Sequence, residues 1–544
     1  MNLQEVFAHR VATGLRRQSI TSPSRWAEQY RMMSKGPWKF DRYPWLRDMH
    51  DCRAEMVIGM KGAQLGFTEL CLNLVFYKMD IEGVSCLYLL PSKTPDAAEF
   101  SSSRFDVALE LSPHLQAMFS EVKNVSLKRA GKSSLFVRGT QSKAGLRSLP
   151  VGFIVLDERS AMNQENVPLA LQRVKGQDAF QVYQISTPTI AGENIDWEYN
   201  RSSQGHFYFE CPGCKTFQTL TFPECIVITA EEPTDPNVKN SYLQCPKCFK
   251  VLPHQEKADW LRINEWVHGY ADRDIKGFHI NQLFSPTVSP GTIALEFLFA
   301  QSDQVREQEF FNGDLGLTHA VAGAQIKDEQ IKECKRNHRN DDPAPRNNKL
   351  ITLGIDVGSW CHFEVCEWSF PKNFTIDAPE TAKCKVIKQG KVTAFDDLDR
   401  IIQFYQPHQF VIDANPETRL ALALCLRYNG IGAMCYYGRG LKDKTITVKK
   451  DEPVITVHRT SWMDLALGRF HKGSIEIPLD SNLEYADHLK APVRVPKRDD
   501  DGNPTASYEN GTKPDHHAHA RTYAEIAMSL AMAGGTNGDL GKIV

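Results

Sequence analysis

Short apolar runs alternate with helix-length segments in two stretches of the chain, and a polar stretch separates them. In the first stretch, residues 55–189, the apolar runs fall at 56–60, 85–91, 134–140, 152–158 and 180–187. Segments 69–80 and 97–112 between them have the length and pattern of helices. This alternation predicts an α/β domain with a mainly parallel sheet.

The same alternation returns after residue 349. Apolar runs fall at 349–360, 362–370, 382–390, 409–415 and 432–440, and the first three follow one another directly. Leu398, Ile401, Ile402 and Tyr405 recur at the spacing of one helix face. A second α/β domain is therefore predicted.

The remaining segments suggest boundaries. Residues 1–50 are predicted to be helical, with a packed aromatic loop near 36–48, and residues 51–204 to form the core of the first domain. Residues 205–326 carry cysteine pairs and mixed, partly buried structure, and the charged stretch 327–349 is predicted to be an interdomain linker. The second domain is expected over 350–535, and 536–544 as a flexible tail.

Size and composition agree with this division. A chain of 544 residues exceeds what one hydrophobic core supports, and 42% hydrophobic with 24% charged residues is typical of a folded globular protein. With a formal net charge of -2, contacts to nucleic acid would need local basic surfaces. No run approaches the roughly 18 apolar residues of a spanning helix, and the N-terminus lacks a signal-peptide core, so no membrane partner and a cytoplasmic location are expected.

A phosphate-binding loop is predicted between the first strand and the helix after it. The pattern departs from GxxxxGK[ST], because Phe67 replaces the lysine and Lys61 stands where the first glycine would be. Lys61 can still reach the phosphates of ATP, and Thr68 can offer its hydroxyl to Mg²⁺. The predicted nucleotide-binding residues of the loop are Lys61, Gly62, Ala63, Gln64, Gly66, Phe67 and Thr68. An ordinary strand-to-helix turn is the alternative.

Two further strands end in polar residues that fit an ATPase. The run 151–156 delivers Asp157, a magnesium ligand, and Glu158, a base for the attacking water. Ser186, Thr187 and Pro188 end another strand, where they would sense the γ-phosphate. An acidic helix cap and a hydroxyl-rich turn are the plainer alternatives. Arg147 and Tyr43 are weaker candidates, for charge neutralisation and for stacking on adenine.

Cys211, Cys214, Cys245 and Cys248 form two Cys-x-x-Cys pairs separated by 30 residues. Two such turns present four thiolates to one Zn²⁺, with no position left open for catalysis, so a structural zinc ribbon is predicted. Coincidental buried cysteines or a redox pair are the alternatives, and Cys225 and His254 are expected to be bystanders.

Three acids of the second domain suggest a nuclease. Asp356 and Asp413 each end an apolar strand, and Asp515 precedes a long helix. Three converging carboxylates can hold paired Mg²⁺ or Mn²⁺, and the element order suggests an RNase H-like fold. His516, His517 and His519 would assist or only solvate the helix start, and Glu364 and Asp464 are weaker candidate acids.

The order of these motifs resembles that of the lambda-type large terminase subunits of tailed bacteriophages. The motifs are the displaced loop lysine, the strand-end acids, the cysteine ribbon, the phrases GFHINQLFSP and FFNGDLGL, and the three aspartates. The resemblance covers roughly residues 25–535. It implies an ATP-driven packaging motor that also cleaves concatemeric double-stranded DNA in the host cytoplasm. It also implies a portal protein and a small terminase subunit as partners, and assembly of several copies on the portal.

Two departures qualify the resemblance. Gln64 stands where many terminases carry an arginine, and Asp356 is followed by Val-Gly where relatives often have a polar residue. A helicase or repair ATPase with a nuclease domain is a rival, although a ribbon occupies the place where further helicase motifs are expected. A zinc-stabilised scaffold without enzymatic activity is another rival.

Overall fold

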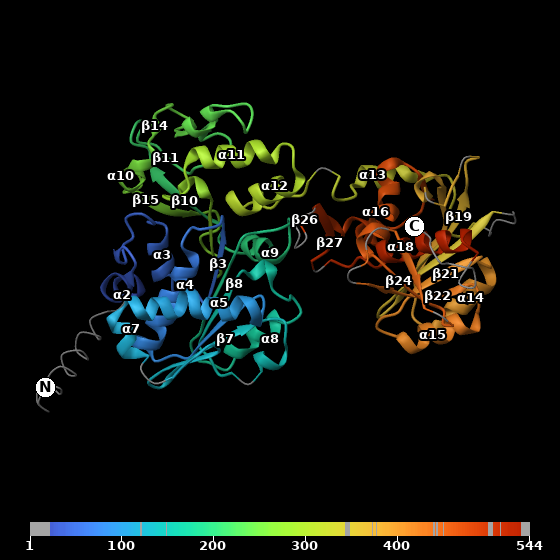
Figure 1. Cartoon of the computed structure of the whole chain (residues 1–544), viewed down its shortest axis with the longest axis horizontal. Coiled ribbons are helices and arrows are strands. Elements are labelled where there is room, and N and C mark those ends of the chain that lie inside the picture. The colour runs from blue at the N-terminus through green and yellow to red at the C-terminus, as the bar shows by residue number, and fades with distance from the viewer. Residues whose placement is uncertain are drawn as a thin grey trace, which may run out of the picture. The chain divides into compact units, whose positions relative to one another are not determined.

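The computed structural model describes residues 22–534, apart from 120, 121, 148, 322, 343–348, 373, 377, 439, 440, 442, 443, 450, 499–503 and 512. The predicted tail, 536–544, and residues 1–21 of the predicted N-terminal region lie outside these residues. The chain divides into two compact units between His319 and Ala320 (Figure 1). Among the described helices, none is both long and apolar enough to cross a bilayer.

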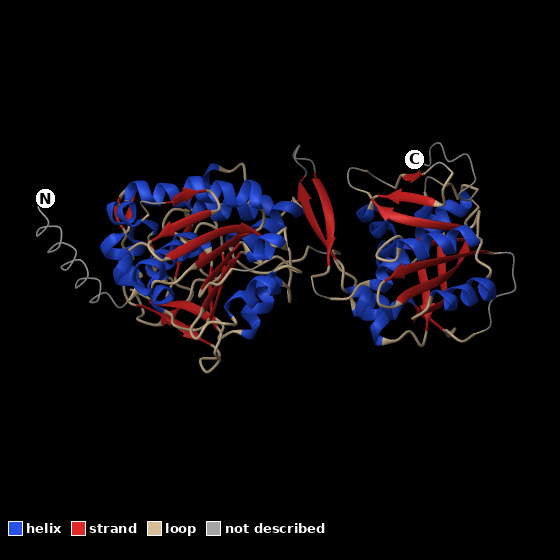
Figure 2. Cartoon of the chain, turned by 90° about the horizontal axis from the view of Figure 1, so that it is seen from below, coloured by secondary structure: helices blue, strands red, loops and turns tan. Residues whose placement is uncertain are grey.

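The first unit is built on a sheet in the order β11-β10-β16-β3-β9-β8-β4-β7-β6-β5. From β10 to β7 neighbouring strands are parallel, whereas β5, β6, β11 and β15 pair antiparallel. The strands β4, β8 and β9 are buried along their whole length, since helices, blue in Figure 2, cover the sheet, whereas β7 and β10 alternate between buried and more exposed residues. All five strands predicted for this stretch are confirmed. Its strands are β1 Met32–Met33, β2 Gly36–Pro37, β3 Met56–Lys61, β4 Cys86–Leu90, β5 Val122–Asn124, β6 Leu127–Ala130, β7 Ser133–Gly139, β8 Phe153–Asp157, β9 Gln181–Ser186, β10 Gly205–Glu210, β11 Phe217–Gln218, β12 Ile226–Val227, β13 Tyr242–Gln244, β14 Val251–Leu252, β15 Asn264–His268 and β16 Lys276–Ile280.

The helices of the first unit are short. They are α2 Pro23–Tyr30, α3 Leu46–Asp51, α4 Phe67–Tyr77, α5 Ala98–Phe100, α6 Val107–Leu111, α7 Pro113–Met118, α8 Val167–Leu171, α9 Asn194–Arg201, α10 Lys257–Trp260, α11 Pro290–Ala300 and α12 Gln304–Glu309. The small sheet β12-β13-β14 lies beside the cysteine pairs. Because β10 and β16 extend the central sheet itself, the region 205–326 is not simply an appended ribbon.

The second unit has the sheet order β17-β25-β20-β19-β18-β21-β22-β24-β23. Its centre is an antiparallel meander, β18-β19-β20, and β21, β22 and β24 follow in parallel on the β18 side. Its strands are β17 Lys335–Arg336, β18 Leu350–Val357, β19 Cys361–Ser369, β20 Lys383–Val392, β21 Gln409–Asp413, β22 Gly432–Tyr437, β23 Ile446–Val448, β24 Val454–Val457, β25 Ile475–Pro478 and the hairpin β26 Val493–Arg498 with β27 Pro504–Glu509. Its helices are α13 Asp328–Cys334, α14 Phe395–Tyr405, α15 Thr418–Arg427, α16 Arg459–Lys472, α17 Leu483–Lys490 and α18 His516–Met532.

Helix α18 lies directly on β18, and one glycine allows this approach. A Cβ at Gly354 would clash with the backbone of Ala520 and Ala524 and would lie 2.9 Å from the carbonyl carbon of Tyr523. The close approach brings the first turn of α18 to the end of β18, where Asp356 lies.

The segment expected as a linker, 327–349, differs from that expectation. Its described part contains α13 and β17, and β17 pairs with β25 of the second unit. Ile331 and Cys334 are buried in that unit's core, which is why a mostly polar stretch folds. The division of the chain therefore falls earlier, at His319.

Candidate functional site: a nucleotide cleft, a cysteine cluster and a nuclease edge

The predicted phosphate loop links the end of β3 to the start of α4. Lys61 is the last residue of β3, and Gly66 caps α4 with a φ of 85°, a conformation that glycine adopts without strain. Thr68 and Glu69 follow in the first turn of the helix, where the helix dipole favours negative charge. The strand, glycine-containing loop and helix of the prediction are therefore present.

Two segments distant in sequence hold the loop from behind. The Gly62 N–H donates to Ile280 O at 2.8 Å, and the Ala63 N–H donates to Gly313 O at 2.6 Å. The acceptors belong to the phrases GFHINQLFSP and FFNGDLGL. Within the described chain, the N–H groups of residues 64–67 donate to no protein acceptor, so they remain free for an anion.

Asp157, at the end of β8, lies beside the loop and is almost fully buried. Its Oδ2 accepts hydrogen bonds from Thr68 Oγ1 at 3.0 Å and from Tyr88 OH at 2.7 Å. Its Oδ1 is buried and has no partner among the described residues. Burial, and next the charge of Glu158, raise the pKa of Asp157. A carboxylate oxygen without a partner beside a threonine hydroxyl fits Mg²⁺, which prefers oxygen ligands.

Glu158 follows with its side chain partly exposed. Its Oε1 lies 3.4 Å from Lys61 Nζ, and its Oε2 accepts a hydrogen bond from Ser186 Oγ at 3.5 Å. Strand β9, which carries Ser186, lies between β3 and β8 and so brings all three residues to one edge of the sheet. Ser160 donates from its Oγ to Thr187 O at 2.9 Å, which ties the turn after Glu158 to the end of β9.

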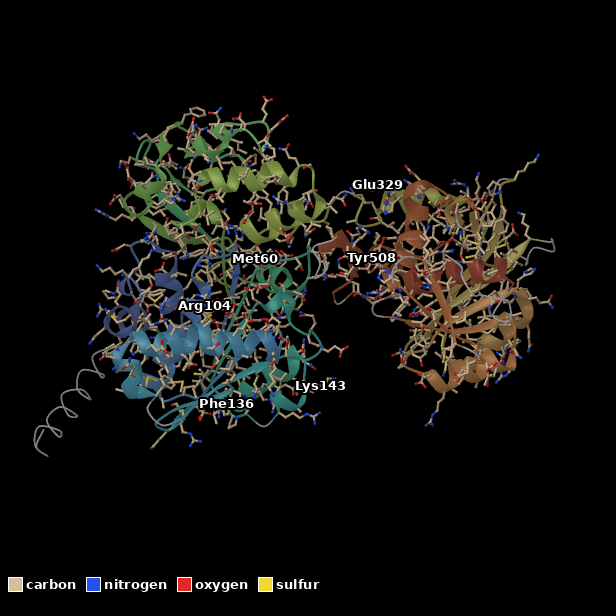
Figure 3. The ribbon with its side chains drawn as sticks, in the orientation of Figure 1. Met60, Arg104, Phe136, Lys143, Glu329 and Tyr508 are labelled. Carbon is tan, nitrogen blue, oxygen red and sulfur yellow. The ribbon has the colours of Figure 1, made fainter. Side chains whose placement is uncertain are left out.

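A cleft of about 790 Å³ opens at this edge. Its lining includes the predicted loop residues Lys61, Ala63, Gln64, Gly66, Phe67 and Thr68, together with Glu158, Thr187 and Tyr43. Arg147 is exposed and is not among these residues. Arg104, labelled in Figure 3, lines the cleft instead, from the segment 101–106 after β4. Pro188 does not line it, and its carbonyl accepts a hydrogen bond from Asn312.

The four cysteines of the predicted ribbon converge. The Cys211 and Cys248 sulfurs are 3.8 Å apart, and those of Cys214 and Cys245 are 3.9 Å apart. Four thiolates about 2.3 Å from one tetrahedral zinc would be about 3.8 Å apart, so the spacing fits the metal. Cys225 lies outside this group, as expected.

Each cysteine pair closes the same kind of turn. The N–H of Lys215 donates to Cys211 O and that of Phe249 donates to Cys245 O, and both donor residues have positive φ. The two equivalent turns therefore present their sulfurs to one point.

The three nuclease aspartates lie at one edge of the second sheet. Asp356 is the second-last residue of β18, Asp413 ends the neighbouring parallel strand β21, and Asp515 is the N-cap of α18. Their oxygens do not all approach within 4.8 Å of one another. The structure thus places them at one edge without closing them into a tight cluster.

The charges around these acids differ. Burial, and next the charge of Asp356, raise the pKa of Asp413 to about 6. Burial also favours the neutral form of Asp515, but His519, 3.3 Å away, and Arg459 outweigh it and lower its pKa. His516 Nδ1 lies 2.8 Å from Asp356 Oδ2, a contact that raises the pKa of His516.

The two weaker candidate acids have other partners. Glu364 is fully buried and binds Arg521 at 2.7 Å and Tyr485 OH at 2.7 Å. Asp464 binds Arg494 at 2.7 Å and accepts a hydrogen bond from Tyr508 OH at 2.9 Å. Both acids therefore act as internal counter-charges.

Sequence reasoning missed several residues of these sites. Tyr88 and Arg104 lie in the interior of a strand and in a helical segment, where nothing in the local pattern distinguishes them. His362 and His488 lie beside His517, and all three are buried. The register of β19 with β18 sets His362 opposite Asp356. This pairing links His362 to the acidic edge, and the sequence alone does not show it.

The fold and the sites define a class. A parallel-sheet unit with a phosphate loop, Asp157 and Glu158 at one edge is an ATPase, and it is joined to a unit whose meander and acidic edge are those of a nuclease.

Comparison with known proteins identifies the family. Residues 33–266 match the family model of the ATPase domain of phage terminase large subunit gpA, and residues 275–400 match that of the gpA endonuclease domain. The chain belongs to the gpA-type, or lambda-type, phage terminase large subunits. It is therefore a viral DNA-packaging ATPase with an endonuclease domain, as the sequence predicted.

A solved structure of full length agrees on the fold. The HK97 bacteriophage large terminase is 12% identical, the alignment covers 93% of this chain and 99% of that one, and the TM-score is 0.51. The Thermus phage P74-26 ATPase domain is 13% identical over 53% of this chain and 98% of that one, with a TM-score of 0.32. A large terminase nuclease from a thermophilic phage is 13% identical over 36% of this chain and 94% of that one, with a TM-score of 0.23. No curated protein matches the chain.

Proposed function

We propose that the cleft beside the phosphate loop binds ATP with Mg²⁺ and that Glu158 activates the attacking water. The observation that carries this proposal is the joint arrangement of Lys61, Glu158, Asp157 and Thr68 at the carboxyl edge of one sheet. Lys61 and the free N–H groups of the loop would hold the phosphates, while Tyr43 would contact the base. Thr68 and Asp157 would hold the magnesium, which when bound neutralises charge on the phosphate oxygens.

The contacts suggest how Lys61 and Glu158 act together. Lys61 Nζ lies within ion-pair distance of Glu158 Oε1, so the carboxylate is partly engaged. A phosphate that takes over Lys61 frees Glu158 to orient and deprotonate a water molecule. Ser186 contacts the same carboxylate, and Thr187 lines the cleft, so β9 would transmit the change to the rest of the unit.

We further propose that Asp356, Asp413 and Asp515 hold the Mg²⁺ or Mn²⁺ ions used in DNA cleavage. The raised pKa of Asp413 supports this role, because two carboxylates close together in a buried edge favour a divalent cation.

One set of preparations tests both sites. Glu158→Gln should lose ATP turnover by on the order of 10²-fold or more while retaining nucleotide binding, and Lys61→Ala should lose turnover too. Asp356→Asn, Asp413→Asn and Asp515→Asn should lose cleavage of supercoiled DNA in Mn²⁺ but hydrolyse ATP normally.

The controls are acids of the same units. Glu165→Gln and Asp396→Asn change exposed carboxylates outside both sites and should leave both activities intact. Full ATPase activity in Glu158→Gln would contradict the first assignment. Normal cleavage by Asp356→Asn would contradict the second.

The cysteine cluster is proposed to bind one structural Zn²⁺. The sulfur spacing fits a tetrahedral thiolate site and leaves no ligand position for substrate. The ion would tie the strands β12, β13 and β14 to the end of β10, whose next residue is Cys211.

Family membership supports the partners. The protein is proposed to act on double-stranded DNA in the host cytoplasm, with a small terminase subunit and the portal, as several copies on that portal. Stimulation of ATP hydrolysis by purified portal, and DNA binding that weakens steeply with salt, would test these proposals.

A further inference from the structure

Three buried histidines converge in the second unit, beside the nuclease edge. His362 lies on β19, His488 on α17 and His517 on α18. Their exposed fractions are 4%, 7% and 2%, and one ring nitrogen of each lies within 4.8 Å of the other two. Each ring centroid is 4.9–5.4 Å from the other two.

The ring nitrogens of this cluster lack partners. Both nitrogens of His362, the Nδ1 of His488 and the Nδ1 of His517 are buried without a hydrogen bond in the described part of the chain. Buried polar atoms are nearly always satisfied, because leaving one unpaired costs about 1–3 kcal/mol. Four buried nitrogens without a hydrogen bond therefore favour a missing partner, since Glu484 Oε1 approaches His362 Nε2 only to 3.7 Å.

The chemistry of that partner follows from the rings. Each ring nitrogen that makes no hydrogen bond can offer a lone pair to a cation. Neutral imidazole is a ligand for zinc, cobalt, nickel and copper, whereas Mg²⁺ prefers oxygen. A water molecule is the alternative partner, but it can donate only two hydrogen bonds to these acceptors.

The geometry and the access suit a metal ion. Ligands at about 2.0–2.1 Å in a tetrahedron are about 3.4 Å apart. The ring nitrogens lie within 4.8 Å of one another, so they need to close by at most about 1.4 Å. His488 also lines a cavity of about 760 Å³ whose wall includes the acids Glu484 and Asp487. This cavity gives a cation a path to the cluster.

His362 lies between this cluster and the nuclease edge. The ring of His516 stacks on that of His362 at 4.7 Å, and its Nδ1 is bonded to Asp356. Ligand atoms of Asp356, His362 and His516 lie within 4.8 Å of one another, so His362 is shared between this group and the three histidines. The bond to Asp356 places His516 with the carboxylates, whereas His488 and His517 are outside that group.

We propose that His362, His488 and His517 bind one divalent transition-metal ion of the zinc, cobalt and nickel class, distinct from the Mg²⁺ or Mn²⁺ of DNA cleavage. The fourth position is taken by water or by Glu484, whose Oε1 lies 3.7 Å from His362 Nε2 and 2.6 Å from Lys391 Nζ. The ion joins β19, α17 and the first turn of α18, and so holds the turn that carries Asp515.

Metal counting in the full chain tests the proposal. Protein saturated with Zn²⁺ and freed of excess should carry two zinc ions per chain, one at the cysteines and one at the histidines. His488→Gln should carry one, and Cys248→Ser should carry one. His471→Gln, a change of an exposed histidine in the same unit, should carry two.

Thermal unfolding in chelator separates a lost ligand from a lost fold. Because the His488 Nδ1 has no hydrogen-bond partner, His488→Gln without metal should unfold near the wild-type temperature. Added Zn²⁺ should raise the unfolding temperature of the second unit in the wild type but not in His488→Gln. Equal zinc content in wild type and His488→Gln overturns the proposal. The proposal is also overturned if the wild-type chain carries a single zinc and Cys248→Ser carries none. This outcome counts even if His488→Gln folds poorly.

Discussion

Gly354→Ala tests whether the packing of α18 on β18 sets the nuclease edge. The added Cβ would lie inside 3.0 Å of three backbone atoms of α18, whereas ordinary contact begins at 3.4 Å. Backbone atoms cannot rotate away as a flexible side chain does, so the helix must move outward by roughly 1 Å in a densely packed core. Overpacking of this kind costs about 1–3 kcal/mol.

The same displacement should also slow DNA cleavage. A displacement of about 1 Å at a catalytic group can lower a rate by about 10²-fold, and α18 carries Asp515 at its first turn. The variant should therefore cleave supercoiled DNA in Mn²⁺ about 10²-fold more slowly. Its second unit should melt about 2–12 °C lower, and ATP hydrolysis by the first unit should be unchanged.

A matched glycine in the same unit provides the control. Gly468 lies inside α16, and a Cβ there meets nothing within 4 Å. Gly468→Ala should stabilise by up to about 1 kcal/mol, because alanine is the better helix former, and should cleave normally. If Gly354→Ala cuts DNA at the wild-type rate, the contact between α18 and β18 does not position the acids, and the reasoning fails.

Three further predictions concern the two units separately. Tyr88→Phe removes a hydrogen bond to Asp157 Oδ2, so half-maximal ATPase activity should need about 10-fold more Mg²⁺ in a magnesium titration. An unchanged titration would show that Asp157 does not hold the magnesium. Cys211→Ser should lose one zinc per chain in elemental analysis and lower the melting temperature of the first unit, whereas Cys225→Ser should keep the zinc. A zinc content of Cys211→Ser equal to that of the wild type would refute the site. Arg521→Met leaves the buried Glu364 and Glu525 poorly paired, so chemical denaturation should show that the free energy of unfolding of the second unit falls by about 3–5 kcal/mol. A fall below about 1 kcal/mol would contradict the view that this pairing is needed.

The strands of both units were predictable because they are buried on both faces. A strand such as β8 or β21 is a continuous apolar run that ends in acids, and that pattern is visible without any partner. The same holds for the cysteine turns, whose ligands are adjacent in sequence.

The surroundings of the phosphate loop were not predictable in the same way. The acceptors Ile280 and Gly313 lie more than two hundred residues beyond the loop that they hold. Their segments, GFHINQLFSP and FFNGDLGL, contribute to the resemblance to large terminases. No pattern within either segment indicates that its carbonyl groups accept hydrogen bonds from Gly62 and Ala63. The polar stretch around α13 was misjudged for a related reason, since Ile331 and Cys334 alone bury its inner face.

The acids of the second unit show most clearly what a sequence lacks. Asp356 and Glu364 lie on neighbouring strands and are both carboxylates in apolar runs, so either suits a metal site by pattern. Register places Gly354 opposite Glu364 and Asp356 opposite His362, so that two levels of the sheet lie under α18. At the inner level Arg521 neutralises Glu364, whereas at the outer level His516 and His517 meet Asp356 and His362. Four residues along the helix, from His517 to Arg521, thus separate the proposed metal-binding edge from a structural ion pair. The register of β18 with β19 and the packing of α18 together decide which acid falls at which level.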